Sequence, residues 1–252
     1  MIGNGSNVLV RDEGYEGVII KLADSFNDTL LYDERDISYK EIPEDTETLT
    51  ISAYGQEKLV IVAKEVSRRG YTGMEPLSGI PGTIGGAVAM NAGAYGTEIN
   101  DIIDSAVVMD TRGNITTLSR EELDLSYRSS VVQSKGLIVL KAVFKLNKGE
   151  QRKIDERLRE CQNARLEKQP LEYPSAGSTF KRPEGYFAGK LIQDAGLKGY
   201  TEGGAQVSEK HCGFVINKNN ATASDIIQVI NHVRDRVYEE FDVMLEPEIK
   251  IL

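Results

Sequence analysis

Two loops of this sequence combine glycine with small polar residues in a way that suits binding of a phosphate group. The first loop is residues 3–7, Gly-Asn-Gly-Ser-Asn, and the second lies within residues 78–96. Glycine has no Cβ, so the backbone can adopt a positive φ and its N–H groups can approach an anion closely. Two such loops suggest one long phosphate-bearing ligand held at two points. For either loop taken alone, a set of ordinary turns explains the composition as well.

Three other segments carry groups that could move a proton or bind an anion. In residues 175–183 small hydroxyl residues, Ser178 among them, precede a pair of cations, and a hydroxyl there could give or take a proton. Arg128 offers a rigid bidentate donor for a carboxylate or phosphate. Glu246 and Glu248 place two carboxylates at the start of a predicted strand. The alternatives are an ordinary loop, a surface arginine and solvated carboxylates.

Several familiar sites are not supported by the sequence. There is no Gly-x-Gly-x-x-Gly opening a helix at Gly3 and no Gly-x-x-x-x-Gly-Lys-Ser/Thr, which argues against Rossmann and P-loop nucleotide sites. The sequence contains no Gly-x-Ser-x-Gly elbow, so a Ser-His-Asp hydrolase gains little support. The two cysteines and two histidines are too few for a disulfide framework or a zinc site, so we expect no metal.

Composition is that of an ordinary soluble globular protein of 252 residues and 27.8 kDa, with room for one large domain or two smaller ones. The net charge of −9 argues against nucleic acid as a partner, which needs a basic face. No run of about 18 apolar residues and no leader pattern occurs, so we expect no membrane span and a cytoplasmic location. Nothing in the sequence indicates assembly, and a monomer is favoured.

The first half of the chain reads as β-rich. Short strands are expected at 8–10, 18–20 and 48–51, a hairpin at 104–118 and a buried strand at 136–146. A helix is expected at 57–69, because its apolar residues follow helical spacing and Gly70 provides a C-cap. The glycine content of residues 78–96 predicts poor helix and poor core there.

The second half begins with a highly charged helix predicted at 150–168 and stopped by Pro170. A compact α+β segment follows, with helices at 185–195 and 224–241 and strands at 213–217 and 245–252. Ser224 or Thr222 can cap the long helix. This change from strands to a mixed segment predicts two domains, residues 1–149 and 150–252.

The motifs occur in the order and context of one family. The chain resembles the UDP-N-acetylenolpyruvoylglucosamine reductases, flavoenzymes of bacterial peptidoglycan precursor synthesis, and the resemblance runs from end to end. It rests on residues 3–12, 76–86, 91–96, 127–130, 176–183 and 245–248. The Ser-Thr-Phe-Lys-Arg-Pro form of the fifth motif and the short third segment look like the type II branch of the family.

The resemblance implies an α+β fold, with an FAD-binding domain of the vanillyl-alcohol-oxidase (PCMH) type over residues 1–149 and a C-terminal α+β substrate-binding domain over residues 150–252. It implies FAD as cofactor and NADPH as hydride donor. The residues expected to bind the cofactor are Gly3, Asn4, Gly5, Ser6, Asn7, Ser78, Gly79, Ile80, Pro81, Thr83, Gly86, Gly93, Ala94, Tyr95 and Gly96.

The same resemblance assigns roles in catalysis and substrate binding. Reduced flavin passes a hydride to C3 of the enolpyruvyl group, and Ser178 matches the serine that protonates C2 from the other side. Arg128 matches the arginine at the substrate carboxylate, and Glu248 the glutamate that works with it. Lys168 and Arg182 are expected to contact the uridine diphosphate. An unactivated serine is a poor acid in water, but it can protonate a carbanion when held within reach in a dry site.

Family members carry a further N-terminal segment before the first glycine loop, whereas Met1 here stands two residues before that loop. The resemblance therefore implies an N-terminally incomplete FAD-binding domain. One alternative is a flavin-free remnant that binds the sugar nucleotide without turnover. Another is an oxidase of the same fold with covalently attached flavin, which would need a histidine or cysteine near the glycine loops, and residues 1–96 contain none.

Overall fold

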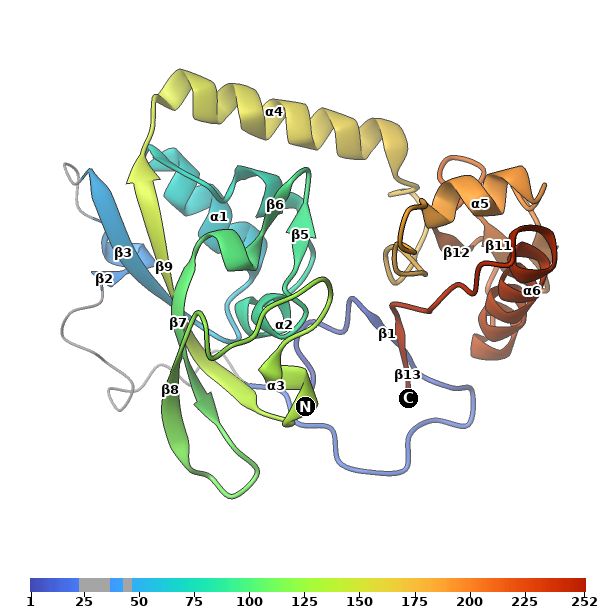
Figure 1. The fold of residues 1–252 in the computed structure, drawn as a ribbon, viewed down its shortest axis with the longest axis horizontal. Coiled ribbons are helices and arrows are strands. Elements are labelled where there is room, and N and C mark those ends of the chain that lie inside the picture. The colour runs from blue at the N-terminus through green and yellow to red at the C-terminus, as the bar shows by residue number, and fades with distance from the viewer. Residues whose placement is uncertain (23–36, 43–46) are drawn as a thin grey trace. The chain divides into compact units, whose positions relative to one another are not determined.

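The computed structural model describes residues 1–22, 37–42 and 47–252, which form two compact units. The first unit comprises residues 1–4 and 19–163, and the second comprises residues 5–18 and 164–252. Each unit has its own apolar core. Mixed helices and sheets in both confirm the α+β class expected from the sequence (Figure 1).

The first unit is built on a twisted sheet with the strand order β2-β3-β9-β7-β8 (Figure 1). The long strand β9 runs antiparallel to both β3 and β7, β2 is parallel to β3, and β4 pairs with the end of β9. Residues 139–144 of β9 are all buried, which confirms the expected buried strand. The strands are β2 (Ile37–Ser38), β3 (Thr48–Tyr54), β4 (Tyr71–Thr72), β7 (Ile103–Met109), β8 (Ile115–Ser119) and β9 (Ile138–Lys148).

Strands β7 and β8 form the hairpin expected at 104–118. Asp110 closes its turn, because its carboxylate accepts hydrogen bonds from the backbone N–H groups of Arg112 and Asn114. The left-handed backbone of Gly113, at φ +86°, completes the reversal.

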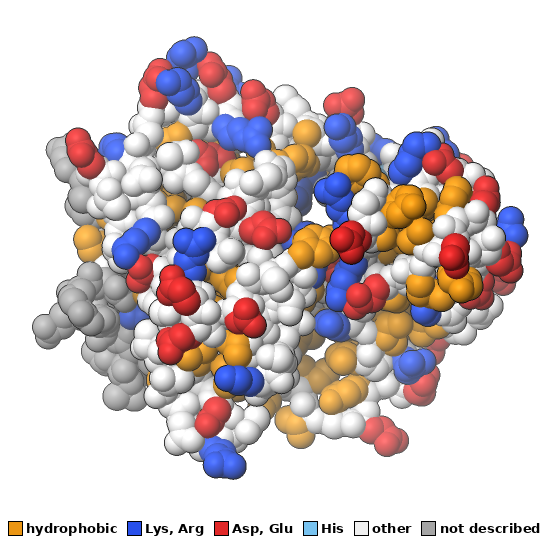
Figure 2. Space-filling view, viewed as in Figure 1, with side chains coloured by type: hydrophobic (Ala, Val, Ile, Leu, Met, Phe, Trp, Pro, Cys, Tyr) orange, Lys and Arg blue, Asp and Glu red, His pale blue; other side chains and the backbone are white. Residues whose placement is uncertain are grey.

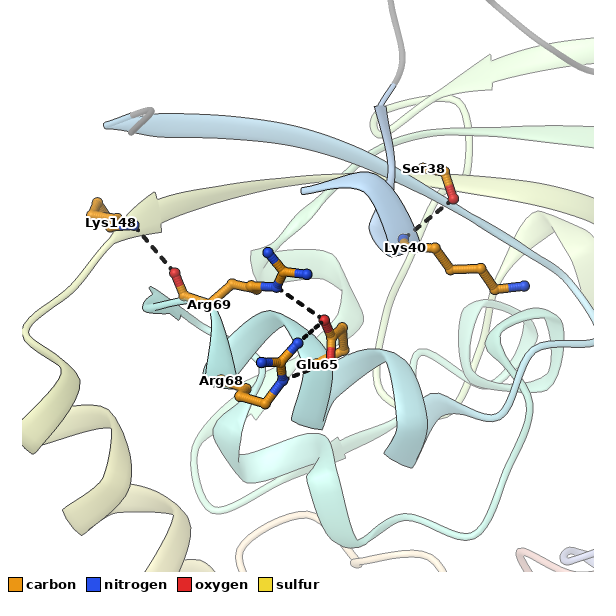
Figure 3. A network of polar contacts seen from close by, with 6 residues as sticks. All are labelled: Ser38, Lys40, Glu65, Arg68, Arg69 and Lys148. Carbon is orange, nitrogen blue, oxygen red and sulfur yellow. Dashed lines mark hydrogen bonds and ion pairs between the residues drawn. The ribbon is translucent and has the colours of Figure 1, made fainter. Parts of the chain in front are cut away.

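Helix α1 (Leu59–Arg68) confirms the helix expected before Gly70. Its core face is Leu59, Val62, Ala63 and Val66, all fully buried, and the left-handed Gly70 follows its end. In the last turn the Glu65 carboxylate accepts from Arg68 and Arg69, and Lys148 at the end of β9 donates to the Arg69 carbonyl (Figure 3). The Arg68 hydrogen bond lowers the pKa of Glu65 below its ordinary 4.5. These contacts tie α1 to the sheet.

The glycine-rich segment differs from its expected structure. It forms a short 3-10 helix (Glu75–Gly79) and helix α2 (Ile84–Ala89), and Leu77, Ile84 and Val88 are fully buried. The prediction of poor helix and poor core was therefore wrong for this part. The reason is local, because Thr83 caps α2 by accepting from the Gly86 N–H, and the apolar residues between the glycines face the core.

The strand expected at 18–20 is also wrong. Val18, Ile19 and Ile20 are exposed, and no strand is assigned there in the described residues. A β-branched triplet favours a strand only where a neighbouring strand can pair with it. The elements that complete the first unit are a 3-10 helix (Tyr39–Glu41), β5 (Gly93–Ala94), β6 (Thr97–Glu98), a 3-10 helix (Ile99–Asp101) and α3 (Val131–Ser134).

Helix α4 (Gln151–Lys168) confirms the charged helix expected at 150–168, and the boundary between the two units falls within it. Among its few apolar residues, Ile154 and Cys161 are buried and Leu166 is exposed. Acidic and basic side chains alternate over α4 in Figure 2, in keeping with the ion pairs Arg152–Glu156 and Arg157–Glu160. The domain division at 149/150 stays a prediction, which we propose because β9 ends at Lys148 and α4 begins at Gln151.

The second unit contains two helices, α5 (Ala188–Asp194) and α6 (Ala223–Phe241). It also contains a three-stranded sheet of β10 (Thr201–Glu202), β11 (Ala205–Val207) and β12 (Val215–Asn217). Thr222 caps α6 in a capping box with Asp225, and Asp12 accepts from the first two backbone N–H groups of the helix. The strand expected at 245–252 is confirmed only as β13 (Lys250–Ile251), parallel to β1 (Val8–Leu9). Pro247 has no N–H to donate to a longer ladder.

Candidate active site

The first glycine loop and the glycine-rich segment meet in the first unit. The Asn4 side chain donates to the Pro81 carbonyl at 2.9 Å. At Gly3 an added Cβ would lie 2.6 Å from the Thr83 hydroxyl oxygen, so no larger residue fits there. The hydroxyl is also the cap of α2, with Gly86 N at 3.2 Å. Five of the residues expected to bind the cofactor, Gly3, Asn4, Pro81, Thr83 and Gly86, thus lie in one place.

A cavity of about 350 Å³ opens beside these loops within the first unit. Gly3, Thr83 and Gly86 line it, together with the apolar side chains of Ala89, Val132, Leu137, Ile138 and Val139. Its volume falls within the roughly 300–1,000 Å³ typical of small-molecule sites. The cavity therefore joins an apolar wall to the backbone of the glycine loops.

Gln56 is the unusual residue of this cavity. Its amide nitrogen and oxygen are both buried, and neither has a hydrogen-bond partner among the described residues. A buried amide without partners costs free energy, so it calls for a polar ligand. Sequence reasoning missed Gln56, whose only local signal was its place between a strand and a helix.

The remaining cofactor residues of the first unit lie in two tight turns. The Ser78 hydroxyl donates to the Glu75 carbonyl. The N–H of Ile80, the residue after Gly79, donates to the Leu77 carbonyl. Gly93 and Ala94 form β5, which pairs with β6, and an added Cβ on Gly93 would lie 2.9 Å from the Thr97 carbonyl oxygen. Tyr95 and Gly96 turn the chain in left-handed conformations at φ +50° and +86°.

Arg128 lies beside the same loop. It occupies a tight turn in which Ser126 and Ser129 exchange two backbone hydrogen bonds of 3.1 Å, and its φ is +55°. Its guanidinium donates to the carbonyls of Asn91 and Gly93 at 3.4 and 3.3 Å. The expected carboxylate-binding arginine is therefore brought together with the cofactor loop 93–96.

The segments that carry Ser178 and Glu248 pair through their backbones in the second unit. The Glu248 N–H donates to the Thr179 carbonyl at 2.8 Å, and the Lys181 N–H donates to the Glu246 carbonyl at 2.8 Å. Ser178 is exposed and Glu248 is half-buried. Ser178 and Glu248 thus belong to two segments that are joined by a short antiparallel bridge.

Thr179 anchors this bridge. It is buried, its N–H donates to the Gly213 carbonyl at 2.8 Å, and its hydroxyl oxygen accepts from the Val215 N–H at 2.9 Å. His211 in turn accepts from the Gly213 N–H through Nδ1 at 3.1 Å. Burial lowers the pKa of His211, which favours the neutral ring that this hydrogen bond requires. Neither role could be predicted from the sequence, because the partners of Thr179 are distant in the chain and nothing local marks the contact of His211 with Gly213.

The other predicted residues of the second unit are Gly5, Ser6 and Asn7 at the end of the first glycine loop, and Lys168 and Arg182, which are expected to contact the substrate. Asn7 donates to the Glu248 carbonyl at 3.2 Å, while Gly5 at φ +71° and Ser6 precede it. Lys168 is exposed at the end of α4. Arg182 is exposed, donates to the Tyr186 carbonyl and lies 4.0 Å from the Phe187 ring centroid.

Comparison with known proteins gives this fold and site a class. Residues 1–119 match the family model of an FAD binding domain, and residues 169–252 match that of the C-terminal domain of UDP-N-acetylenolpyruvoylglucosamine reductase. The protein is an FAD-dependent oxidoreductase with the two-domain α+β architecture expected from the sequence. It belongs to the UDP-N-acetylenolpyruvoylglucosamine reductase family, whose cofactors are FAD and NADPH.

The similarity to known reductases extends over the whole chain. All 252 residues align at 51% identity with the reductase of Lachnoclostridium phytofermentans and at 48% with that of Agathobacter rectalis, and they cover 78% and 79% of those proteins. The crystal structure of the Thermus caldophilus reductase matches 99% of this chain at 35% identity and a TM-score of 0.80, with 83% of that chain covered. No helix in the described residues is long and apolar enough to cross a bilayer.

Proposed function

We propose that this protein reduces the enolpyruvyl group of UDP-N-acetylenolpyruvoylglucosamine to give UDP-N-acetylmuramate, a step of peptidoglycan precursor synthesis, with NADPH as reductant. The observation that carries the proposal is the backbone pairing of Thr179, the neighbour of Ser178, with Glu248, within a chain of this reductase family. A hydroxyl and a carboxylate carried by two paired segments suit protonation of a carbon next to a substrate carboxylate.

The residues present fit FAD. The glycine loops supply close backbone at Gly3, Thr83 and Gly86, and the apolar wall of the cavity suits an aromatic ring system. Gln56 offers a donor and an acceptor that both lack partners among the described residues. We therefore assign Gly3, Asn4, residues 78–86 and residues 93–96 to holding the cofactor, with Gln56 as an addition to the set.

When bound, FAD supplies the hydride that passes from NADPH to C3 of the enolpyruvyl group. The chain's own groups complete the reaction at C2 and at the carboxylate. The Ser178 hydroxyl donates its proton to C2, so that one hydride and one proton together saturate the double bond. Glu248, whose segment pairs with Thr179, can hold the developing acid form of the substrate carboxylate.

Arg128 serves the proposed reaction by charge. Electron density moves from C2 into the adjacent carboxylate as the hydride arrives, and a fixed guanidinium stabilises that state more than the ground state. Its planar fork matches two carboxylate oxygens, which a lysine ammonium does not. Lys168 and Arg182 are the positively charged residues that we propose to bind the uridine diphosphate.

Steady-state turnover tests this function. NADPH oxidation by the FAD-loaded protein should depend on UDP-N-acetylenolpyruvoylglucosamine, and mass spectrometry should show a product heavier by two hydrogen atoms. In deuterium oxide the hydrogen added at C2 should be deuterium, because that proton comes from an exchangeable hydroxyl. NADPH consumption that does not depend on the substrate would contradict the proposal, and no bound FAD would favour a sugar-nucleotide-binding remnant.

A further inference from the structure

We infer that Asn91 is a positioning residue that fixes Arg128, and this inference rests on the function proposed above for that arginine. Asn91 is fully buried and lies in the left-handed region at φ +40°. Asparagine enters this region more readily than most residues. A buried amide needs hydrogen-bond partners, so the partners of Asn91 show which segments it holds together.

The Asn91 side chain joins two segments. Its oxygen accepts from the Asn100 N–H at 2.9 Å. Its nitrogen donates to the Glu98 carboxylate at 2.8 Å and to the Ser126 carbonyl at 3.1 Å, which uses both N–H bonds of the amide. One side chain therefore links the loop that follows the glycine-rich segment to the turn that carries Arg128.

The backbone of Asn91 makes a second contact with the same target. Its carbonyl oxygen accepts from Nη1 of Arg128 at 3.4 Å, while the side chain holds Ser126 two residues earlier. A single buried residue, Asn91, therefore contacts both the turn that carries Arg128 and the guanidinium of Arg128. From the other side, Gln133 donates to the carbonyls of Arg128 and Ala89.

This arrangement matters because an arginine side chain has many rotamers and loses considerable entropy when it is held in one. A misplacement of about 1 Å at a reacting group can cost on the order of a hundredfold in rate. Asn91 and Arg128 are far apart in the sequence, so the turn at 126–129 depends on such tertiary contacts for its place. We expect loss of the amide to affect the step that needs Arg128 and to spare the step that does not.

The substitution Asn91→Gly isolates the amide, because glycine adopts the left-handed backbone without strain. The FAD spectrum and the rate of flavin reduction by NADPH should stay within about twofold of wild type. Reoxidation of the reduced flavin by the enolpyruvyl sugar nucleotide should become at least about tenfold slower. In an Arg128→Ala background the same substitution should change reoxidation by less than about twofold, because coupled residues are non-additive.

A matched control separates positioning of Arg128 from disturbance of the cofactor loop. Arg157 donates to the Tyr95 carbonyl of that loop at 2.9 Å and also to the Glu160 carboxylate of its own helix. Any loss caused by Arg157→Ala should therefore persist in full in the Arg128→Ala background.

A second pair of variants covers the case in which Asn91→Gly fails to fold. Asn91→Asp removes both donors and sets a carboxylate against Glu98, so reoxidation should slow by at least about tenfold. Adding Glu98→Gln returns one donor to the pair and should recover part of the rate. Equal rates with and without Glu98→Gln would count against the inference.

The outcomes separate the inference from the function on which it rests. Unchanged reoxidation in Asn91→Gly, or a loss that adds in full to that of Arg128→Ala, would overturn the positioning role while the proposed function stands. If the wild-type reduced flavin is not reoxidised by the enolpyruvyl sugar nucleotide, the proposed function fails, and the positioning role fails with it.

Discussion

The backbone N–H of Glu248 donates to the carbonyl of Thr179 at 2.8 Å, so the residue after Ser178 is bonded directly to the C-terminal glutamate. Sixty-nine positions separate Thr179 and Glu248 along the chain (248 − 179). The bridge joins the backbone of the segment that carries Ser178 to that of the segment that carries Glu248. It also gives Thr179 a role that can be tested apart from the chemistry.

Thr179→Val should weaken both the fold and the site. The Val215 N–H would lose its acceptor in a buried place, which costs about 1–3 kcal/mol in the free energy of unfolding. Reoxidation of reduced flavin by the substrate should slow as Ser178 loses its fixed place. Thr179→Ser keeps the hydroxyl and serves as the control. Chemical denaturation and stopped-flow absorbance measure the two effects, and equal stability of the valine and serine variants would contradict this account.

Ser178→Ala should leave flavin reduction by NADPH unchanged and slow the reoxidation of reduced flavin by about 10²–10⁴-fold, the range typical of a lost general acid. Ser175→Ala, which removes a hydroxyl from the same exposed loop, is the matched control and should affect neither half-reaction. Stopped-flow absorbance separates the two steps. Equal reoxidation rates for Ser178→Ala and wild type would remove Ser178 from the mechanism.

Gln56→Leu should have effects of opposite sign on stability and on cofactor binding. The flavin-free protein should gain about 1 kcal/mol in the free energy of unfolding, because an unpaired buried amide is replaced by an apolar group. FAD affinity should fall about tenfold, because the ligand loses both hydrogen bonds. Ser67→Ala removes another buried unpaired group, which does not line the cavity, and should leave FAD affinity unchanged. Fluorescence titration with FAD checks this, and equal affinity of wild type and Gln56→Leu would contradict it.

His211 should make stability depend on pH. Burial lowers its pKa below the ordinary 6.5, so below that pH the unfolded chain takes up a proton that the folded protein resists. The free energy of unfolding should therefore fall more steeply between about pH 7.5 and about pH 5.5 in wild type than in His211→Asn, which keeps an acceptor for Gly213 without titrating. Denaturation at the two pH values measures this, and parallel losses in both proteins would exclude His211 as the cause.

The sequence predicted best the elements whose signals are local. The helix at 57–69, the hairpin at 104–118 and the capped helix after Thr222 are confirmed, because periodic apolar residues and capping residues specify them. Two predictions failed where tertiary context decides. Residues 18–20 found no strand partner, and the glycine-rich segment formed α2 around the Thr83 cap.

The candidate site divides in the same way. Its motif residues could be named from the sequence, since they match the family in order and type. The contacts of Asn91 and Thr179 could not be predicted, because their partners Ser126 and Val215 are distant in the chain. Nothing in the local sequence marks the contact of His211 with Gly213 or the buried amide of Gln56. The roles of the motif residues stay predictions, and the variants described above test them one by one.

The central claim is tested most directly by the visible absorption of the purified protein after addition of FAD, followed under anaerobic conditions by NADPH and then by UDP-N-acetylenolpyruvoylglucosamine. The account predicts bound flavin bands that bleach with NADPH and return in full with one equivalent of substrate. Bands that bleach and stay bleached when the substrate is added would contradict the claim that this flavoprotein is a reductase of the enolpyruvyl sugar nucleotide.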